Sequence, residues 1–249
     1  MNMINFNIES SDCILELLIL ICKIHYNYLG RLEHMKFKTI IFDLDGTLLS
    51  TLEDLRDSVN AVLSSNGFPT RSLEEVRNFV GNGVGRLMHL AVPDTCTEEE
   101  VSVYLEAFKQ HYSLNMKNKT KPYDGIIELL DRLNQKDYNL AIVSNKFDAA
   151  VKDLSRDYFG DRIPVAIGES PNVKRKPAPD SVFKALEELG ADPEHAIYVG
   201  DSDIDVLTAK NAGISSIGVT WGFRSRSVLQ EAGADYIIDN PKEIWPIIE

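Results

Sequence analysis

Residues 39–47 read Thr-Ile-Ile-Phe-Asp-Leu-Asp-Gly-Thr, so an apolar run leads directly into two acidic residues. A short uninterrupted run of β-branched and aromatic residues is typical of a strand that is buried on both faces, as in a parallel sheet. Asp43 and Asp45 follow two residues apart on an extended segment, so their side chains point the same way. Such carboxylates repel one another unless a cation or a proton holds them together, whereas an Asp-Gly pair alone would indicate only a turn.

From residue 36 onward, short apolar runs that predict strands alternate with helical segments. The predicted strands are residues 39–42, 139–143, 165–167, 196–199, 216–219 and 236–238. Helices are predicted to begin near Phe147, Pro179, Ile204, Arg226 and Pro241. This repeated β-α order predicts an α/β fold with a parallel sheet covered by helices on both faces.

Residues 52–121 interrupt this alternation, because they contain helical patterns and no strand-like run. Helical periodicity covers residues 52–65, 73–80, 84–91 and 98–112. We therefore expect a small all-helical domain inserted after the first strand, with residues 35–51 and 122–249 forming the α/β core. Pro122, just before Tyr-Asp-Gly, is the expected return turn.

Residues 1–34 precede this pattern and are expected to be an N-terminal extension, either appended to the native protein or poorly ordered. Their most apolar stretch, residues 13–22, contains Glu16 and is too short to cross a bilayer. A signal peptide is also disfavoured, because no Lys or Arg precedes that stretch. No membrane association is expected.

The composition narrows the class of partner. The 249 residues include 26 Lys and Arg against 38 Asp and Glu, a net charge of −12, which disfavours a nucleic-acid partner. The 3 cysteines, an odd number without a C-x-x-C pair, indicate neither a disulfide framework nor a cysteine zinc site and suit the reducing cytoplasm. The choice between monomer and homodimer stays open.

A second acidic cluster, residues 200–205, reads Gly-Asp-Ser-Asp-Ile-Asp and follows the apolar strand 196–199. An EF-hand is excluded for both clusters, because the glycine that its sixth loop position needs is Leu48 in one and Val206 in the other. Parallel strands place their carboxyl ends at one edge of the sheet, so the two clusters are expected to meet. Oxygen ligands from two strand ends suit Mg²⁺.

Two further features point to a phosphate. Ser144, Asn145 and Lys146 follow the strand 139–143, where a hydroxyl and backbone N–H groups at the start of a helix would suit an anion. Residues 174–176, Lys-Arg-Lys, then place three cations before another helix. A helix cap or a basic turn alone would be merely structural, but both features lie at predicted strand ends together with the acidic clusters.

The chain resembles the haloacid dehalogenase superfamily of phosphohydrolases. The four ordered motifs that carry the resemblance are Asp43-Leu-Asp45-Gly-Thr47, Ser144-Asn145, Lys176-Pro177, and Gly200-Asp201-Ser202 with Asp205. The resemblance covers about residues 36–249 and implies a Rossmann-like core, with residues 52–121 as the all-helical cap domain. Gly81-Asn82-Gly83 and Gly218-Val-Thr-Trp221-Gly222 further resemble phosphoglycolate phosphatases, although Ser50 stands where that subfamily commonly has Asp.

The resemblance implies Mg²⁺-dependent hydrolysis of a phosphomonoester through an aspartyl-phosphate, with Asp43 as the nucleophile. Mg²⁺ would be held by Asp43, by the backbone carbonyl of Asp45 and by Asp201, and Asp205 would be a further ligand or an orienting group. Asp45 would act first as general acid and then as general base. The groups implied to hold the phosphoryl oxygens are Ser144, the backbone N–H of Asn145, and Lys176.

The expected substrate is a small phosphorylated metabolite, with 2-phosphoglycolate as the first candidate. The expected substrate contacts of the cap are Gly81, Asn82, Gly83 and Arg86, although a plain helix–helix turn is an equal alternative. A glycine-rich turn lets the backbone approach closely, and Arg86 could pair with a second anionic group. An inorganic pyrophosphatase, a nucleotidase, or a sugar-phosphate phosphatase or mutase would use the same core residues. A catalytically silent binding protein is the remaining alternative.

Overall fold

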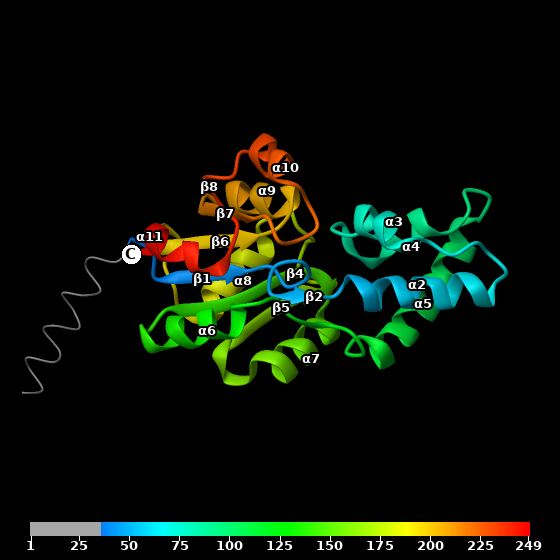
Figure 1. The fold of residues 1–249 in the computed structure, drawn as a ribbon, viewed down its shortest axis with the longest axis horizontal. Helices are drawn as coiled ribbons and strands as arrows, with labels where there is room; N and C mark the ends of the chain where they lie inside the picture. The colour runs from blue at the N-terminus through cyan, green and yellow to red at the C-terminus, as the bar shows by residue number, and fades with distance from the viewer. Residues whose placement is uncertain (1–35) are drawn as a thin grey trace, which may run out of the picture. The chain divides into compact units, whose positions relative to one another are not determined.

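The structure of the chain, a computed structural model, describes residues 36–249, and the predicted extension over residues 1–34 lies outside the described residues. Figure 1 traces the described chain from β1 to the C-terminal helix α11. Within this range no helix combines the length and the apolar character needed to span a membrane.

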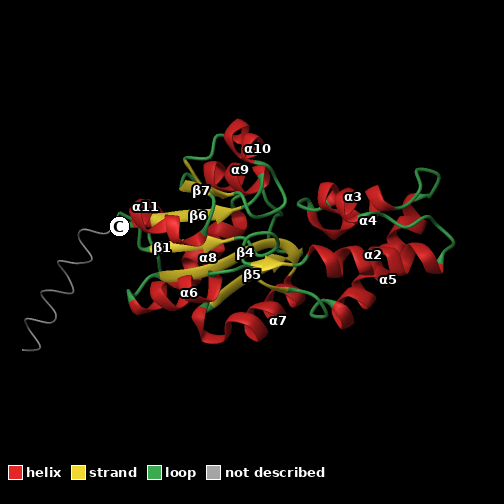
Figure 2. Ribbon diagram, viewed as in Figure 1, coloured by secondary structure: helices red, strands yellow, loops and turns green. Residues whose placement is uncertain are grey.

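Six parallel strands form the central sheet (Figure 2). They are β1 (Thr39–Phe42), β4 (Asn139–Phe147), β5 (Val165–Glu169), β6 (Ala196–Gly200), β7 (Ser215–Val219) and β8 (Tyr236–Ile238). Their order, β5-β4-β1-β6-β7-β8, puts β1 between β4 and β6, and Phe42 at its end pairs with Ile142 and Val199. The predicted strands and the α/β class are therefore confirmed, and the end of β1 lies beside the ends of both neighbours.

Strand β4 is longer than predicted, which changes the position expected for the polar residues that follow residue 143. Ser144, Asn145 and Lys146 lie within the strand, which runs on to Phe147, rather than at the start of a helix. The pairing with β5 shifts register between Val143 and Phe147, so the chain stays extended past the regular ladder. Helix α7 (Asp148–Phe159) begins only afterwards, and the three polar side chains stand at the edge of the sheet.

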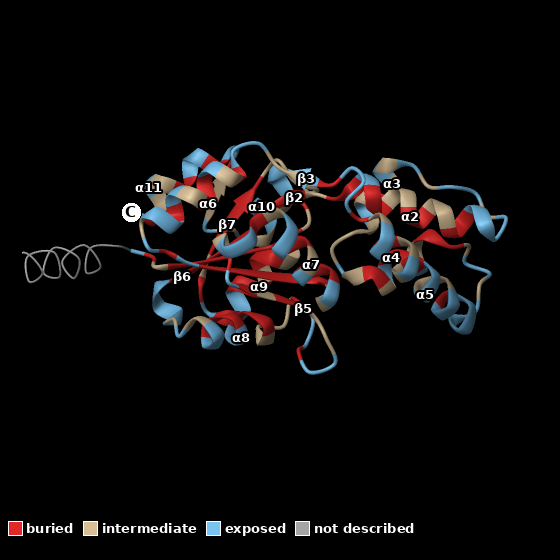
Figure 3. Cartoon of the chain, turned by 90° about the horizontal axis from the view of Figure 1, so that it is seen from below, coloured by how far each residue is buried: buried red, intermediate tan, exposed pale blue. Residues whose placement is uncertain are grey.

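Helices lie on both sides of the strands in Figure 3. Helices α8 (Asp180–Leu189) and α9 (Asp203–Ala212) contribute Val182, Ala185 and Ala209 to one buried cluster with strand residues such as Ile41 and Tyr198. Helix α10 (Arg226–Ala232) begins at its predicted residue. The predicted helix at Pro241 begins instead as a 3₁₀ turn, Pro241–Ile244, which leads into α11 (Trp245–Ile248).

Helix α6 (Ile126–Gln135) was not predicted. It buries one face, made of Ile126, Leu129, Leu130 and Leu133, at the i, i+3, i+4, i+7 spacing of an amphipathic helix. Two short 3₁₀ turns, Gly160–Arg162 and Pro193–His195, complete the connections between the strands and helices.

Four helices form the predicted insert after β1, and no strand lies among them. They are α2 (Leu52–Ser65), α3 (Leu73–Phe79), α4 (Gly83–Ala91) and α5 (Glu98–Asn115). Side-chain capping boxes start α3 at Ser72 and α5 at Thr97, where Glu75 and Glu100 bond back to the cap backbone. The all-helical character of the insert is confirmed.

The insert leaves and returns through two short strands, β2 (Leu49–Ser50) and β3 (Lys121–Pro122), which pair antiparallel. The buried carboxylate of Asp54, at the start of α2, accepts the backbone N–H groups of Lys119 at 3.0 Å and Thr120 at 2.8 Å. These bonds fasten the first helix of the insert to the segment that closes it.

Candidate active site

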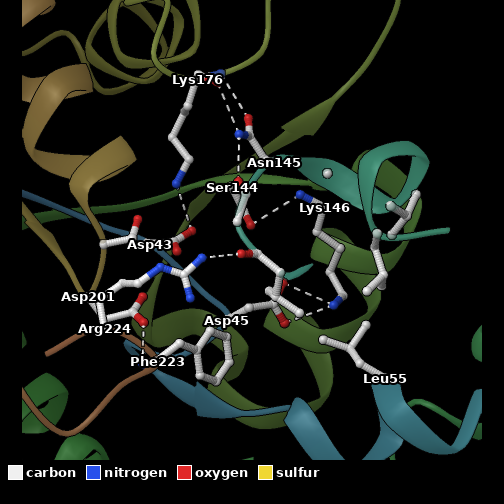
Figure 4. A pocket seen from close by; sticks show the side chains of 16 residues that line it. Asp43, Asp45, Leu55, Ser144, Asn145, Lys146, Lys176, Asp201, Phe223 and Arg224 are labelled. Carbon is white, nitrogen blue, oxygen red and sulfur yellow. Dashed lines mark hydrogen bonds and ion pairs between the residues drawn. The ribbon is translucent and has the colours of Figure 1, made fainter. Parts of the chain in front are cut away.

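A pocket of about 570 Å³, part of it open to solvent, lies where the strands end (Figure 4). Its polar lining comes from segments far apart in the chain, because parallel strands bring their ends together. The lining side chains that sequence patterns singled out are Asp43, Asp45, Ser144, Asn145, Lys176 and Asp201. The structure thus brings together the end of β1, the end of β4, the loop after β5 and the end of β6.

Three buried carboxylates form the acidic centre of this site. One oxygen each from Asp43, Asp201 and Asp205 lies within 4.8 Å of the other two, and all three residues are buried. Burial raises the pKa of Asp43 to about 7, although Lys176 opposes the shift. Burial and the nearby Asp205 and Asp43 also raise the pKa of Asp201. A hard cation would relieve this repulsion, so the donor set fits Mg²⁺.

Asp201 and Asp205 are oriented by different donors. Asp201 accepts hydrogen bonds from the hydroxyl of Thr47 at 3.3 Å and from the backbone N–H of Phe223 at 2.7 Å. One carboxylate oxygen of Asp205 accepts a hydrogen bond from the ammonium of Lys176 at 2.7 Å. The other oxygen accepts hydrogen bonds from the backbone N–H and the hydroxyl of Ser202. Protein donors therefore contact both oxygens of Asp205, and one of these donors is Lys176.

Gly46 is required by the close approach of the two acidic loops. Its φ is +89°, and a Cβ built there would lie 2.4 Å from a carboxylate oxygen of Asp201. Both the left-handed backbone and the contact exclude a side chain. The glycine that follows Asp45 therefore lets the carboxylate of Asp201 lie against the β1 loop.

Lys176 connects the acidic centre with the end of β4. Its buried ammonium lies 2.9 Å from Oδ1 of Asp43 and 3.0 Å from the hydroxyl of Tyr198. Burial opposes the charge, but Asp205 and Asp43 hold the pKa of Lys176 well above its ordinary value. The side chain of Asn145 accepts the backbone N–H of Lys176 at 2.8 Å and donates to its carbonyl at 3.1 Å, which fixes this segment.

The insert lines the pocket with apolar and glycine residues. They are Leu55, Val80, Gly81, Gly83, Val84 and Leu87. The carbonyl of Gly81 accepts a hydrogen bond from the side chain of Asn145 at 3.1 Å. Asn82 and Arg86 are exposed and are not among the lining residues, so only two of the four expected cap residues lie at the pocket.

The polar lining residues Lys146 and Arg224, and the neighbouring Phe223, were not among the expected site residues. Lys146 was visible as a cation directly after Ser144-Asn145, but no local pattern shows that its ammonium lies 2.8 Å from Asp45. Arg224 follows the Trp221-Gly222-Phe223 segment and donates to the carbonyls of Arg77 at 2.9 Å and Val80 at 2.6 Å. Such partners are set by tertiary structure.

Comparison with known proteins agrees with this fold and site. Residues 40–219 match the family model described as haloacid dehalogenase-like hydrolase, and the chain belongs to this family. It is 32% identical over 216 residues, 85% of this chain and 97% of the relative, to a phosphoglycolate phosphatase of Aquifex aeolicus.

Two solved structures are also similar to the chain. The first, from Lactobacillus delbrueckii, has a TM-score of 0.81 at 36% identity and covers 86% of this chain and 99% of its own. The second, described as a predicted phosphoglycolate phosphatase from Haemophilus somnus, has a TM-score of 0.80 at 30% identity and covers 86% and 99%. The chain is therefore a haloacid dehalogenase-like hydrolase that is similar to phosphoglycolate phosphatases.

Proposed function

We propose that this hydrolase is a Mg²⁺-dependent phosphomonoesterase of small metabolites, with 2-phosphoglycolate as its first candidate substrate. The observation that carries this proposal is the position of Lys176, whose ammonium lies 2.9 Å from Asp43 and 2.7 Å from Asp205, two members of the acidic centre that also contains Asp201. A cation next to a buried carboxylate suits a reaction in which that carboxylate meets a phosphate dianion. The names of the similar phosphatases support the choice of substrate.

Asp43 is the proposed nucleophile, and its attack on phosphorus forms an aspartyl-phosphate while the ester oxygen leaves. Asp43, Asp201 and the backbone carbonyl of Asp45 would hold the Mg²⁺, with Asp205 as a further ligand or an orienting group. The ion would neutralise charge shared by the carboxylate and the phosphate. Because Lys176 contacts one oxygen of Asp205 and Ser202 contacts the other, the orienting role of Asp205 has the stronger structural support.

Asp45 is the proposed general acid for the departing alkoxide and then the general base for the water that cleaves the aspartyl-phosphate. Its carboxylate lines the pocket and is 12% exposed, so it can meet both a leaving group and water. Ser144, the backbone N–H of Asn145 and Lys176 are proposed to bind the phosphoryl oxygens, where they stabilise charge as it spreads.

Residues 52–121 are proposed to act as a cap domain over a core formed by residues 35–51 and 122–249. The pocket supports this role, because one side of its lining comes from the insert and the other from the strand ends. A cap that excludes bulk water protects the aspartyl-phosphate and selects the leaving group. Gly81 and Gly83 are the best placed of the expected cap residues.

The test is phosphate release from 2-phosphoglycolate, pyrophosphate, nucleoside monophosphates and sugar phosphates, with Mg²⁺ and with EDTA. Asp43→Asn protein, purified in the same way, is the control for contaminating phosphatases. We expect Mg²⁺-dependent release that is concentrated on 2-phosphoglycolate and absent in the variant. Preference for pyrophosphate, a nucleotide or a sugar phosphate would replace the substrate but keep the mechanism, and no release from any of them would contradict the proposed function.

A further inference from the structure

Lys146 makes an ion pair that the proposed chemistry does not require. Its ammonium lies 2.8 Å from one oxygen of Asp45 and 3.1 Å from the other, so it contacts both oxygens of the proposed general acid (Figure 4). The side chain of Lys146 is 2% exposed. A charge so deeply buried is costly unless a partner compensates it, and Asp45 is that partner.

The other side of the Lys146 ammonium faces the helical insert. It lies 4.5 Å from the ring centroid of Tyr112, a residue of α5 with no exposed surface. The Tyr112 ring stacks on Phe108 at 5.5 Å and meets Phe147, at the end of β4, edge-on at 6.4 Å. The ammonium is thus held between a carboxylate of the core and an aromatic face of the insert.

Lys176, the other lysine that lines the pocket, has a different set of partners from Lys146. Lys176 already contacts Asp43 and Asp205, and it is the residue proposed to bind the phosphoryl group. Because the buried ammonium of Lys146 contacts both oxygens of Asp45, it restricts the rotation of the Asp45 carboxylate.

We propose that Lys146 is a positioning residue that sets the orientation of the Asp45 carboxylate and, through the ring of Tyr112, links that orientation to helix α5 of the insert. This inference rests on the proposed function, because Asp45 is its general acid and base. Lys146 then acts only through Asp45 and does not bind the substrate. Placement errors of about 1 Å at a reacting group can slow turnover about 10²-fold, which sets the scale of the effect.

The experiment compares kcat and KM of the full chain and its variants with 2-phosphoglycolate and with para-nitrophenyl phosphate, which has no carboxylate. Lys146→Met removes the charge and keeps the length of the side chain. Lys146→Arg restores the charge, and Lys152→Met removes an exposed lysine that pairs with Asp148 on α7. Circular dichroism and melting temperature verify that each variant folds.

We expect Lys146→Met to lower kcat about 10-fold to 100-fold for both substrates with little change in KM, and Lys146→Arg to recover part of the loss. Lys152→Met should match the wild type. The decisive comparison is the double variant Asp45→Asn, Lys146→Met, which should be no slower than Asp45→Asn alone, since Lys146 acts through Asp45.

Two results would overturn the inference. Multiplied losses in the double variant would show that Lys146 acts independently of Asp45. A rise in KM confined to 2-phosphoglycolate, with kcat unchanged, would make Lys146 a binding residue for the substrate carboxylate. If Lys146→Met fails to fold, Tyr112→Leu is the second variant, with a lower kcat expected in the wild-type background and no further loss in Asp45→Asn.

The proposed function fails in a different way. A folded wild-type protein that hydrolyses no phosphate ester contradicts the proposed function, and the inference about Lys146 with it. If the wild type is active and the losses of kcat caused by Lys146→Met and Asp45→Asn multiply in the double variant, only the inference about Lys146 is contradicted.

Discussion

The ammonium of Lys176, in the loop after β5, lies 2.9 Å from the carboxylate of Asp43 at the end of β1, although the two residues are 133 positions apart. The contact puts a fixed cation next to the proposed nucleophile and allows the carboxylate to be buried. The same cation is available to a phosphate that arrives beside Asp43. We therefore expect Lys176 to contribute both to stability and to turnover.

Lys176→Met should lower kcat/KM at least about 10²-fold, because removing one charge-stabilising donor from a buried site typically has an effect of that size. It should also leave Asp43 and Asp205 without their buried partner, which lowers the melting temperature. Steady-state kinetics and thermal unfolding measure the two effects. Near wild-type kinetics in a folded variant would contradict the proposed role of Lys176.

Asp45→Asn should slow turnover about 10²-fold to 10⁴-fold, the range typical of a lost general acid or base. Metal binding should be largely intact, because only the backbone carbonyl of Asp45 is proposed to contact Mg²⁺. Calorimetric titration of Mg²⁺ alone into the variant checks the second point. A variant that hydrolyses its substrate at the wild-type rate would remove Asp45 from the mechanism.

The metal-free protein should lose stability between about pH 4 and pH 7, and Mg²⁺ should reduce that loss. Burial raises the pKa of Asp43 to about 7, against about 3.9 for an unfolded aspartate, so folding favours its protonated form. That contribution is fully present below about pH 4 and is lost as the pH rises through about 7. Asp201 acts in the same direction, since its pKa is also raised.

Urea unfolding from pH 5 to pH 8, with EDTA or with saturating Mg²⁺, measures this dependence. Mg²⁺ at about 100 times its Kd should add about 2.7 kcal/mol of stability, provided that the unfolded chain does not bind it. Asp43→Asn should flatten the profile in EDTA, because the titrating group is gone. Two results would contradict the assignment of a metal site. One is an unfolding midpoint in EDTA that rises with pH, and the other is a midpoint at pH 8 that is the same in Mg²⁺ as in EDTA.

Arg224→Met should raise KM about tenfold or more. The guanidinium donates to the carbonyls of Arg77 and Val80, which hold the turn of the insert at the pocket. A hydrogen bond from a charged donor contributes about 1.5–3 kcal/mol, and 1.4 kcal/mol corresponds to a factor of ten. Arg86→Ala is the matched comparison, because Arg86 is exposed and outside the pocket lining. A larger effect from Arg86 than from Arg224 would restore the sequence-based expectation.

The difference between Arg86 and Arg224 shows how far sequence patterns reach in this protein. Strand ends were predicted because apolar runs are local and end abruptly, and this placed Asp43 and Asp201 at one edge of the sheet. The partners of Lys146 and Arg224 were not predicted, because these contacts span 101 and 144 positions and are set by tertiary structure. The face of α6, in contrast, has a plain helical spacing that the sequence already contained.

The most direct test of the central claim, that Asp43 is the nucleophile, is to detect the aspartyl-phosphate on Asp43. The wild-type protein is mixed with Mg²⁺ and a phosphate ester that it hydrolyses, and the reaction is quenched in acid during turnover. The protein is then digested and analysed by peptide mass spectrometry. We predict one phosphate on the peptide that contains Asp43, and none in Asp43→Asn. Turnover that leaves this peptide unmodified at every quench time, or a phosphate found on another residue, would contradict Asp43 as the nucleophile.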